Sequence, residues 1–111
     1  MLNRLNAYRI MWLMVMFDLP TETKQQRKKY AQFRKTLMSF GFNMFQFSIY
    51  LRHCPSAETA DMHKRRLRNI VPDEGMIGVL QITDKQFEKM EIYYGKKVKK
   101  TPQSAIQLEL F

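Results

Sequence analysis

The most hydrophobic part of the chain is a short run near the N-terminus that is apolar at consecutive positions. Ile10 to Phe17 is unbroken, and Asp18, Leu19 and Pro20 follow it. The run is too short for a typical helix, includes β-branched and aromatic residues, and ends at a proline, which cannot continue a ladder of backbone hydrogen bonds. We therefore predict a buried strand over 8–18. Because the apolar positions do not alternate, both faces of this strand are expected to be covered.

The following segment has the periodicity of an amphipathic helix. Thr21 suits an N-cap and Gly41 a C-cap, so we predict one helix between them. At 100° per residue, Tyr30, Phe33, Leu37 and Phe40 form an apolar stripe. The opposite, cationic side consists of Lys24, Lys28 and Lys35, flanked by Arg27 and Arg34.

The rest of the chain alternates between strand and helix patterns. The segment 42–52 predicts a half-buried strand, bent or broken in two, with Tyr50 and Arg52 on its polar side. In the helix after it, Arg65 and Arg68 face outward and His63 lies on the apolar edge. The predicted later elements are a helix between Ser56 and Pro72, a strand over 76–83, a helical turn over 83–89 and a short strand over 90–94.

This order of elements indicates an α+β fold, a ferredoxin-like βαββαβ sandwich with an extra C-terminal strand. Two helices on one face of the sheet leave the other face open, and a second copy of the chain would cover it most economically, so we predict a homodimer. Residues 1–95 form the predicted domain. Residues 96–111 are predicted to be a basic hinge and a C-terminal docking tail, in which Ile106, Leu108 and Leu110 alternate with polar residues.

The charge of the chain indicates an anionic partner. Nineteen Lys and Arg face ten Asp and Glu, a formal charge of +9, which nucleic acid, acidic lipid or the ribosome would neutralise. The four glycines lie singly, so no phosphate-binding loop is expected. Ile10 to Phe17 is too short to span a membrane and Cys54 is the only cysteine, which together favour a cytoplasmic protein without a disulfide.

The first half of the chain contains a set of distinctive motifs, namely Met16-Phe17-Asp18-Leu19-Pro20, Arg27-Lys28-Lys29-Tyr30, Phe33-Arg34-Lys35, and Gly41-Phe42 leading into Gln46-Phe47-Ser48-Ile49-Tyr50. Together these motifs resemble those of the CRISPR-associated Cas-two family, in particular the branch that accompanies single-effector systems. That resemblance implies a small ferredoxin-like dimer that captures new spacer DNA alongside the Cas-one integrase. It also implies a metal-dependent nuclease acting on RNA or DNA, with Asp18 as magnesium ligand and catalytic residue.

Asp18 has two interpretations. From the residues alone, an aspartate two positions before Pro20 most simply turns the chain. The resemblance favours Mg²⁺, which prefers carboxylate and water oxygens and usually needs more than one protein group, so the second ligand is expected to be Asp18 of another copy. Many family members carry tyrosine where this chain has Phe17, so a phenolic proton donor is absent here.

The expected binding residues fall into two groups. The predicted nucleic-acid contacts are Lys24, Arg27, Lys28, Arg34, Lys35, Arg65 and Arg68, each of which could instead be an ordinary solvated side chain. The predicted partner-docking residues are Gln107, Leu108, Leu110 and Phe111, which could add a strand to Cas-one, resemble a sliding-clamp-binding peptide, or pair within the dimer.

Three functions follow from these observations. The first is a homodimer that binds duplex DNA and bridges Cas-one integrase dimers during spacer acquisition. The second is a magnesium-dependent endonuclease, acting on RNA or DNA, that uses Asp18 from both subunits. The third is an RNA-binding regulatory domain, which the basic composition alone would also allow.

Overall fold

Four strands form one antiparallel sheet in the order β2-β3-β1-β4, with the first strand of the chain at its centre. The computed structural model describes residues 10–95 and 97–99. This strand order confirms the predicted ferredoxin-like fold. The strands are β1 (Met11–Asp18), β2 (Asn43–Gln46), β3 (Ile49–Cys54) and β4 (Met76–Thr83).

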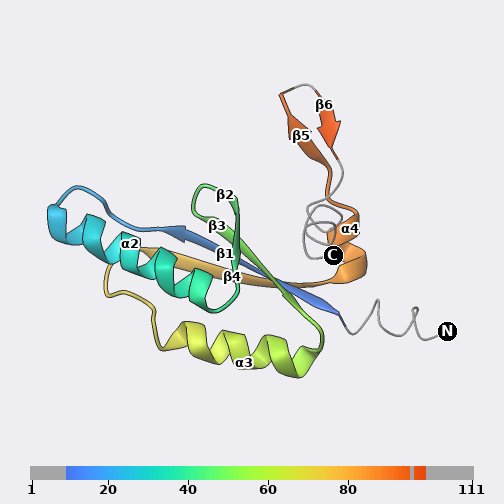
Figure 1. Cartoon of the computed structure of the whole chain (residues 1–111), viewed down its shortest axis with the longest axis horizontal. Coiled ribbons are helices and arrows are strands. Elements are labelled where there is room, and N and C mark those ends of the chain that lie inside the picture. The colour runs from blue at the N-terminus through green and yellow to red at the C-terminus, as the bar shows by residue number, and fades with distance from the viewer. Residues whose placement is uncertain (1–9, 96, 100–111) are drawn as a thin grey trace.

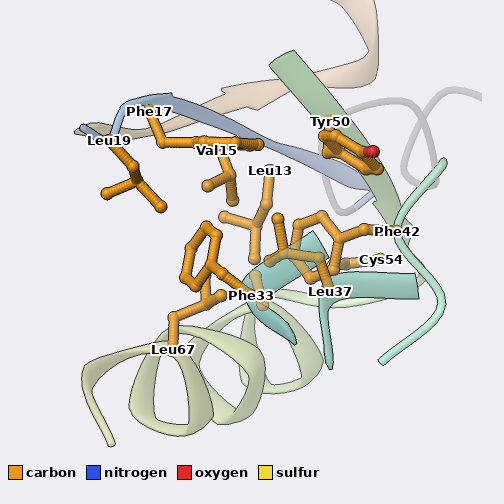
Figure 2. Close-up of a cluster of buried hydrophobic side chains, with 11 residues drawn as sticks. Leu13, Val15, Phe17, Leu19, Phe33, Leu37, Phe42, Tyr50, Cys54 and Leu67 are labelled. Atoms are coloured by element: carbon orange, nitrogen blue, oxygen red, sulfur yellow. The ribbon is translucent and has the colours of Figure 1, made fainter. Parts of the chain in front are cut away.

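Two helices, α2 (Lys24–Ser39) and α3 (Ala57–Arg68), lie side by side on one face of this sheet (Figure 1). The odd-numbered side chains of β1 point toward them, because successive residues of a strand face opposite sides. Leu13 and Val15 meet Phe33 and Leu37 of α2 in the main hydrophobic core (Figure 2). Burying each such side chain contributes about 1.5–3 kcal/mol to folding.

Among the described residues, the other face of the sheet is covered at one end only, by the short helix α4 (Asp84–Glu88). Phe87 of α4 stacks on Trp12 of β1 with ring centroids 4.3 Å apart. The indole Nε1 of Trp12 donates a buried hydrogen bond of 2.8 Å to Asp84 Oδ1. The prediction that both faces of the first strand are covered is therefore correct at this end, and the cover comes from the same chain.

The helix boundaries follow their caps. Thr23, not Thr21, is the N-cap of α2, because its hydroxyl accepts from the Gln26 N–H and the Gln26 side chain accepts from the Thr23 N–H. The predicted start was thus two residues early. Gly41, with φ of 85°, follows the C-cap residue of α2. Ser56 caps α3 as predicted.

The segment 42–52 forms two strands joined by a tight turn at Phe47 and Ser48. This confirms the prediction that the strand could be broken in two. Tyr50 was predicted to lie on a polar face, and this is wrong. Its ring belongs to the main core, because α2 covers that side of β3. Its hydroxyl accepts a hydrogen bond from Nε of Arg34.

The C-terminal part of the described chain is a hairpin of β5 (Ile92–Tyr94) and β6 (Lys97–Lys99), which pair antiparallel. The hairpin stands away from the four-stranded sheet (Figure 1). It includes the first residues of the predicted basic hinge, whereas the docking residues Gln107, Leu108, Leu110 and Phe111 lie outside the described residues. Within the described part, no helix is long and apolar enough to cross a membrane.

Candidate nucleic-acid interface and metal site

Asp18 is the last residue of β1, and its side chain is exposed. Its neighbour in the ladder is Met76 of β4. Because Phe17 faces the helices, Asp18 lies on the opposite side of the sheet, the side that α4 covers only at its far end. The sequence therefore placed this carboxylate correctly at the end of the first strand, and the structure adds the face on which it lies.

Gly75, which lies immediately before β4, packs closely against the backbone of Asp18. This glycine has φ of 92°, in the left-handed region that disfavours side chains. A Cβ atom built there would lie 2.6 Å from the carbonyl oxygen of Asp18 and 2.7 Å from Cδ2 of Leu19. The chain can enter β4 so close to Asp18 only because residue 75 has no side chain.

The described residues supply too few ligands for a magnesium ion at Asp18. Among the described residues, no group of three or more His, Cys, Asp or Glu side chains could hold a metal. Asp18 alone offers one carboxylate, whereas Mg²⁺ seeks six oxygen ligands and is held by carboxylates together with waters and substrate phosphates. A metal site at Asp18 would need donors beyond these described side chains.

The structure shows on which side of the sheet the side chain of residue 17 lies, and this changes the interpretation of Phe17. Its ring is buried against Phe33 and Tyr50 on the helix side of the sheet, with ring centroids 5.1 and 5.7 Å away. A tyrosine at position 17 would extend its hydroxyl on that same side, away from the Asp18 carboxylate. The absence of a phenol here therefore removes no proton donor from the neighbourhood of Asp18.

An apolar face extends from Asp18 toward α4. We call it the open face, and it consists of Met16, Ile49, Met76, Gly78 and Leu80. The ladder aligns Met16 with Ile49 on one side and with Gly78 on the other. Leu80 is 45% exposed, Met16 36% and Met76 73%. Large apolar side chains gathered on a sheet face mark a contact surface.

Two arginines of α2, Arg27 and Arg34, donate hydrogen bonds to neighbouring segments of the same chain. Nη1 of Arg27 donates to the carbonyl oxygens of Thr21 and Glu22, at 3.1 and 3.0 Å, and so fastens the loop that follows Asp18. Nε of Arg34 donates to the Tyr50 hydroxyl at 2.7 Å. This hydrogen bond is the main cause that raises the pKa of the Arg34 guanidinium. Arg34 was predicted on the cationic outer side, but it is half-buried at the edge of the core.

The remaining predicted basic contacts are exposed, as a binding surface requires. Lys24, Lys28 and Lys35 lie along α2, and Arg65 and Arg68 lie on α3, Arg68 as its last residue. Since both helices cover the same side of the sheet, the two groups share one side of the molecule (Figure 1). The open face with Asp18 is on the other side.

The structure assigns structural roles to several residues that the sequence left open. Nε of Arg52 donates to the Phe40 carbonyl, which satisfies a backbone group at the C-terminal end of α2.

His63 is buried, and in the described structure neither ring nitrogen has a hydrogen-bond partner. Its pKa is lowered, first by burial and then by the charges of Arg52 and Arg66. Burial also raises the pKa of the Cys54 thiol, which makes it a poor nucleophile.

Comparison with known proteins agrees with this architecture. Residues 11–90 match the family described as CRISPR associated protein Cas2. A protein of Flavobacterium psychrophilum named CRISPR-associated endoribonuclease Cas2 is 57% identical over 98% of this chain and 95% of its own length. A protein of the same name from Parvibaculum lavamentivorans is 50% identical over 91% of this chain and 100% of its own.

A solved structure titled "Crystal structure of cas2" has the same fold. It superposes with a TM-score of 0.56 at 16% identity, over 81% of this chain and 91% of the other. The match over residues 11–90 includes all four strands of the sheet, both long helices and Asp18. This chain belongs to the CRISPR associated protein Cas2 family.

Proposed function

We propose that this protein acts as a homodimer that binds duplex DNA and bridges Cas-one integrase dimers during spacer acquisition. The observation that carries the proposal is the open face, an apolar surface that none of the described residues covers and that has Asp18 at its end. A two-fold dimer presents every surface twice, which suits a protein that holds two copies of a partner.

The open face supports dimerisation through its composition. Met16, Met76 and Leu80 are apolar and substantially exposed in one chain, and the basic side chains of α2 and α3 lie on the opposite side of the sheet. A second copy can therefore approach the open face without bringing those basic helices together. Two such faces would also bring two Asp18 carboxylates toward each other, as a shared Mg²⁺ requires.

Adjacent residues of β4 provide a matched test of the dimer. Leu80 lies on the open face, and Val79 is similarly exposed, at 40%, on the helix side. We expect Leu80→Glu to convert the dimer to a monomer in analytical ultracentrifugation. Val79→Glu adds the same charge to the same strand and should leave the dimer intact. Dissociation of both variants, or of neither, would contradict the assignment of the interface.

The basic side of the helices supports DNA binding. Each chain has a formal charge of +9, and dimerisation doubles it, so an anionic duplex relieves the repulsion. Binding should weaken steeply with salt, because each neutralised phosphate releases counterions. Charge reversal of Lys24, Lys28 and Lys35 tests this surface without breaking the internal hydrogen bonds of Arg27 and Arg34.

Spacer acquisition in cells distinguishes bridging from catalysis. If the protein is a scaffold, Asp18→Ala retains acquisition, while the triple lysine-to-glutamate variant abolishes it. Circular dichroism and ultracentrifugation should show that both variants remain folded dimers. The reverse pattern, loss with Asp18→Ala and retention with the lysine variant, would refute the scaffold function.

A magnesium-dependent endonuclease is the second candidate, because the relatives are named endoribonucleases and Asp18 is exposed at the end of β1. Mg²⁺ held between two Asp18 carboxylates would supply an activated water for attack on a phosphodiester. Cleavage of RNA or duplex DNA by the purified protein should require Mg²⁺ and disappear with both chelator and Asp18→Ala. The same cleavage by Asp18→Ala would indicate a contaminating nuclease.

A further inference from the structure

Phe47 is an aromatic side chain without a packing role in the described structure. It lies in the turn between β2 and β3 and is 81% exposed, the highest exposed fraction among the large hydrophobic residues described. Exposure of a phenylalanine ring to water is unfavourable. Most aromatic rings among the described residues are packed against the core. Such a ring at the tip of a turn is available to another molecule.

Hydrogen bonds of Ser48 hold the turn that carries this ring in a fixed place. The N–H of Phe17 donates to the Ser48 carbonyl at 3.0 Å, and the hydroxyls of Tyr30 and Ser48 share a hydrogen bond of 3.1 Å. Ser48 itself has φ of 65°, a left-handed conformation that non-glycine residues adopt rarely and that surrounding contacts must maintain. The turn is therefore fastened to both β1 and α2.

The hydrogen bonds from Phe17 and Tyr30 to Ser48 also show where the turn that carries Phe47 lies. The bond to Phe17 places the turn at the end of β1 where Asp18 follows, and Figure 1 shows the turn beside the tip of that strand. The bond to Tyr30 places it beside α2, on which Arg27 and Arg34 lie about one turn to either side of Tyr30.

Both arginines keep donors that face no partner in the described residues. Arg27 uses Nη1 for the carbonyls of the preceding loop, and Arg34 uses Nε for Tyr50. A guanidinium has five N–H donors, and the remaining ones suit phosphate oxygens.

We propose that Phe47 stacks on an unpaired base of a nucleic acid whose backbone contacts Arg27 and Arg34. The proposal rests on the proposed nucleic-acid function and names the part of the ligand that this turn would recognise. Proteins bind single strands without reading their sequence by combining aromatic rings with cationic side chains, and here the exposed ring lies on a turn that is fastened to the cationic helix α2. A second copy is the less suitable occupant of this position, because it would bring its own arginines toward these.

A preference for ends with unpaired bases follows. A blunt duplex keeps its bases stacked on each other, so it offers Phe47 no free base, whereas a single-stranded overhang does. Stacking of one base on an aromatic ring is worth about 5- to 140-fold in affinity, the equivalent of ~1–3 kcal/mol.

The test compares binding of a DNA duplex with a short overhang that carries 2-aminopurine and of the blunt duplex of the same length. With wild-type protein, stacking should quench 2-aminopurine fluorescence. Phe47→Ala and Phe47→Leu should lose the quenching and at least fivefold of the overhang affinity, and Phe47→Trp should retain both. Blunt-duplex affinity should not change. Met44→Ala, which removes another exposed apolar side chain from the same hairpin, should behave as wild type.

Ultracentrifugation of the same variants identifies the competing occupant. If Phe47→Ala dissociates the dimer, the ring packs against a second copy and the stacking proposal is wrong. If the dimer persists and overhang binding equals that of wild type, the proposal is also wrong, although duplex binding remains. Failure of wild-type protein to bind either DNA would instead refute the proposed function itself.

Discussion

Gly75→Ala should destabilise the protein more than any other alanine substitution at a glycine with positive φ, because it forces the backbone next to Asp18 to move. The new Cβ would lie 2.6 Å from the Asp18 carbonyl oxygen and 3.1 Å from the Leu19 Cα. Real Cβ contacts below 3.0 Å are essentially absent, and a main-chain atom paired in a sheet has no free rotation with which to withdraw.

The magnitude follows from three contributions. The left-handed conformation costs an alanine about 1–2 kcal/mol, and the collision adds ~1–3 kcal/mol, as overpacking of a core does. Alanine has less conformational freedom than glycine in the unfolded chain, which offsets this destabilisation by ~0.4–1 kcal/mol. The free energy of unfolding should therefore fall by about 1–5 kcal/mol, centred near ~3 kcal/mol, which lowers the urea midpoint by roughly 1–2 M.

Gly41→Ala is the matched control. Gly41 has a similar φ of 85°, but its new Cβ would meet Nε and Cζ of the Arg52 side chain, at 2.8 and 3.1 Å. A side chain can rotate away and lose its hydrogen bond to the Phe40 carbonyl, a loss of about 1 kcal/mol. This control should cost ~1–2 kcal/mol in total.

Urea unfolding at one fixed protein concentration measures both variants. The single tryptophan, Trp12, is buried against Phe87 and reports unfolding by its fluorescence. An unfolding free energy for Gly75→Ala equal to or above that of Gly41→Ala would refute the argument. It would mean that the backbone at Asp18 yields more easily than the side chain of Arg52.

Three further predictions concern other parts of the molecule. Asp84→Ala leaves the buried N–H of Trp12 without its acceptor and should cost about 1–3 kcal/mol in urea unfolding, whereas Asp84→Asn, which keeps an acceptor, should cost less. Burial lowers the pKa of His63, so the unfolded chain binds a proton first and stability should fall as the pH drops through about 6.5. His63→Leu should reduce this acid sensitivity but not remove it, since the pKa of His53 is also lowered; an unchanged pH profile would contradict the argument. Deletion of 107–111 should abolish capture of Cas-one or of the sliding clamp in a pull-down while DNA binding persists, and retained capture of both would exclude the tail as their docking segment.

The order of elements could be predicted because each long element carries its own periodic pattern. The consecutive apolar residues of β1 and the spacing of Phe33 and Leu37 each specify a local conformation and a buried side. Ser56 marked the start of α3 for the same reason, since an N-cap hydroxyl acts on the backbone three residues ahead. Thr21 misled because Thr23, two residues later, has the glutamine that completes a capping box.

The errors share a different cause, contacts between residues far apart in the chain. Nothing near Tyr50 in sequence indicates that α2 will cover its ring or that Arg34 will bind its hydroxyl. In the same way, the pairing of Trp12 with Asp84 joins residues 72 positions apart. A strand with a core on each side has no polar face, so alternation along 42–52 could not show which side meets solvent.

The candidate site was predictable only in part. The position of Asp18 followed from the end of an apolar run, but its face depends on the register with β4. The significance of Phe17 was misjudged, because residues adjacent in sequence point to opposite sides of a strand. Phe47 belonged to a recognised motif, yet its exposure arises from the turn at Ser48, which no pattern of apolar residues specifies.

The central position of β1 has a consequence for how the chain folds. This strand is made first, but one of its two neighbours, β4, ends at Thr83, so its ladder closes only after most of the chain exists. Contacts of such long separation slow folding, because the intervening loop must be ordered before they form. The other neighbour, β3, ends at Cys54 and can pair earlier, so the edge of β1 that faces β4 stays unpaired until β4 is available. During synthesis, this unpaired edge of a hydrophobic strand needs protection from aggregation.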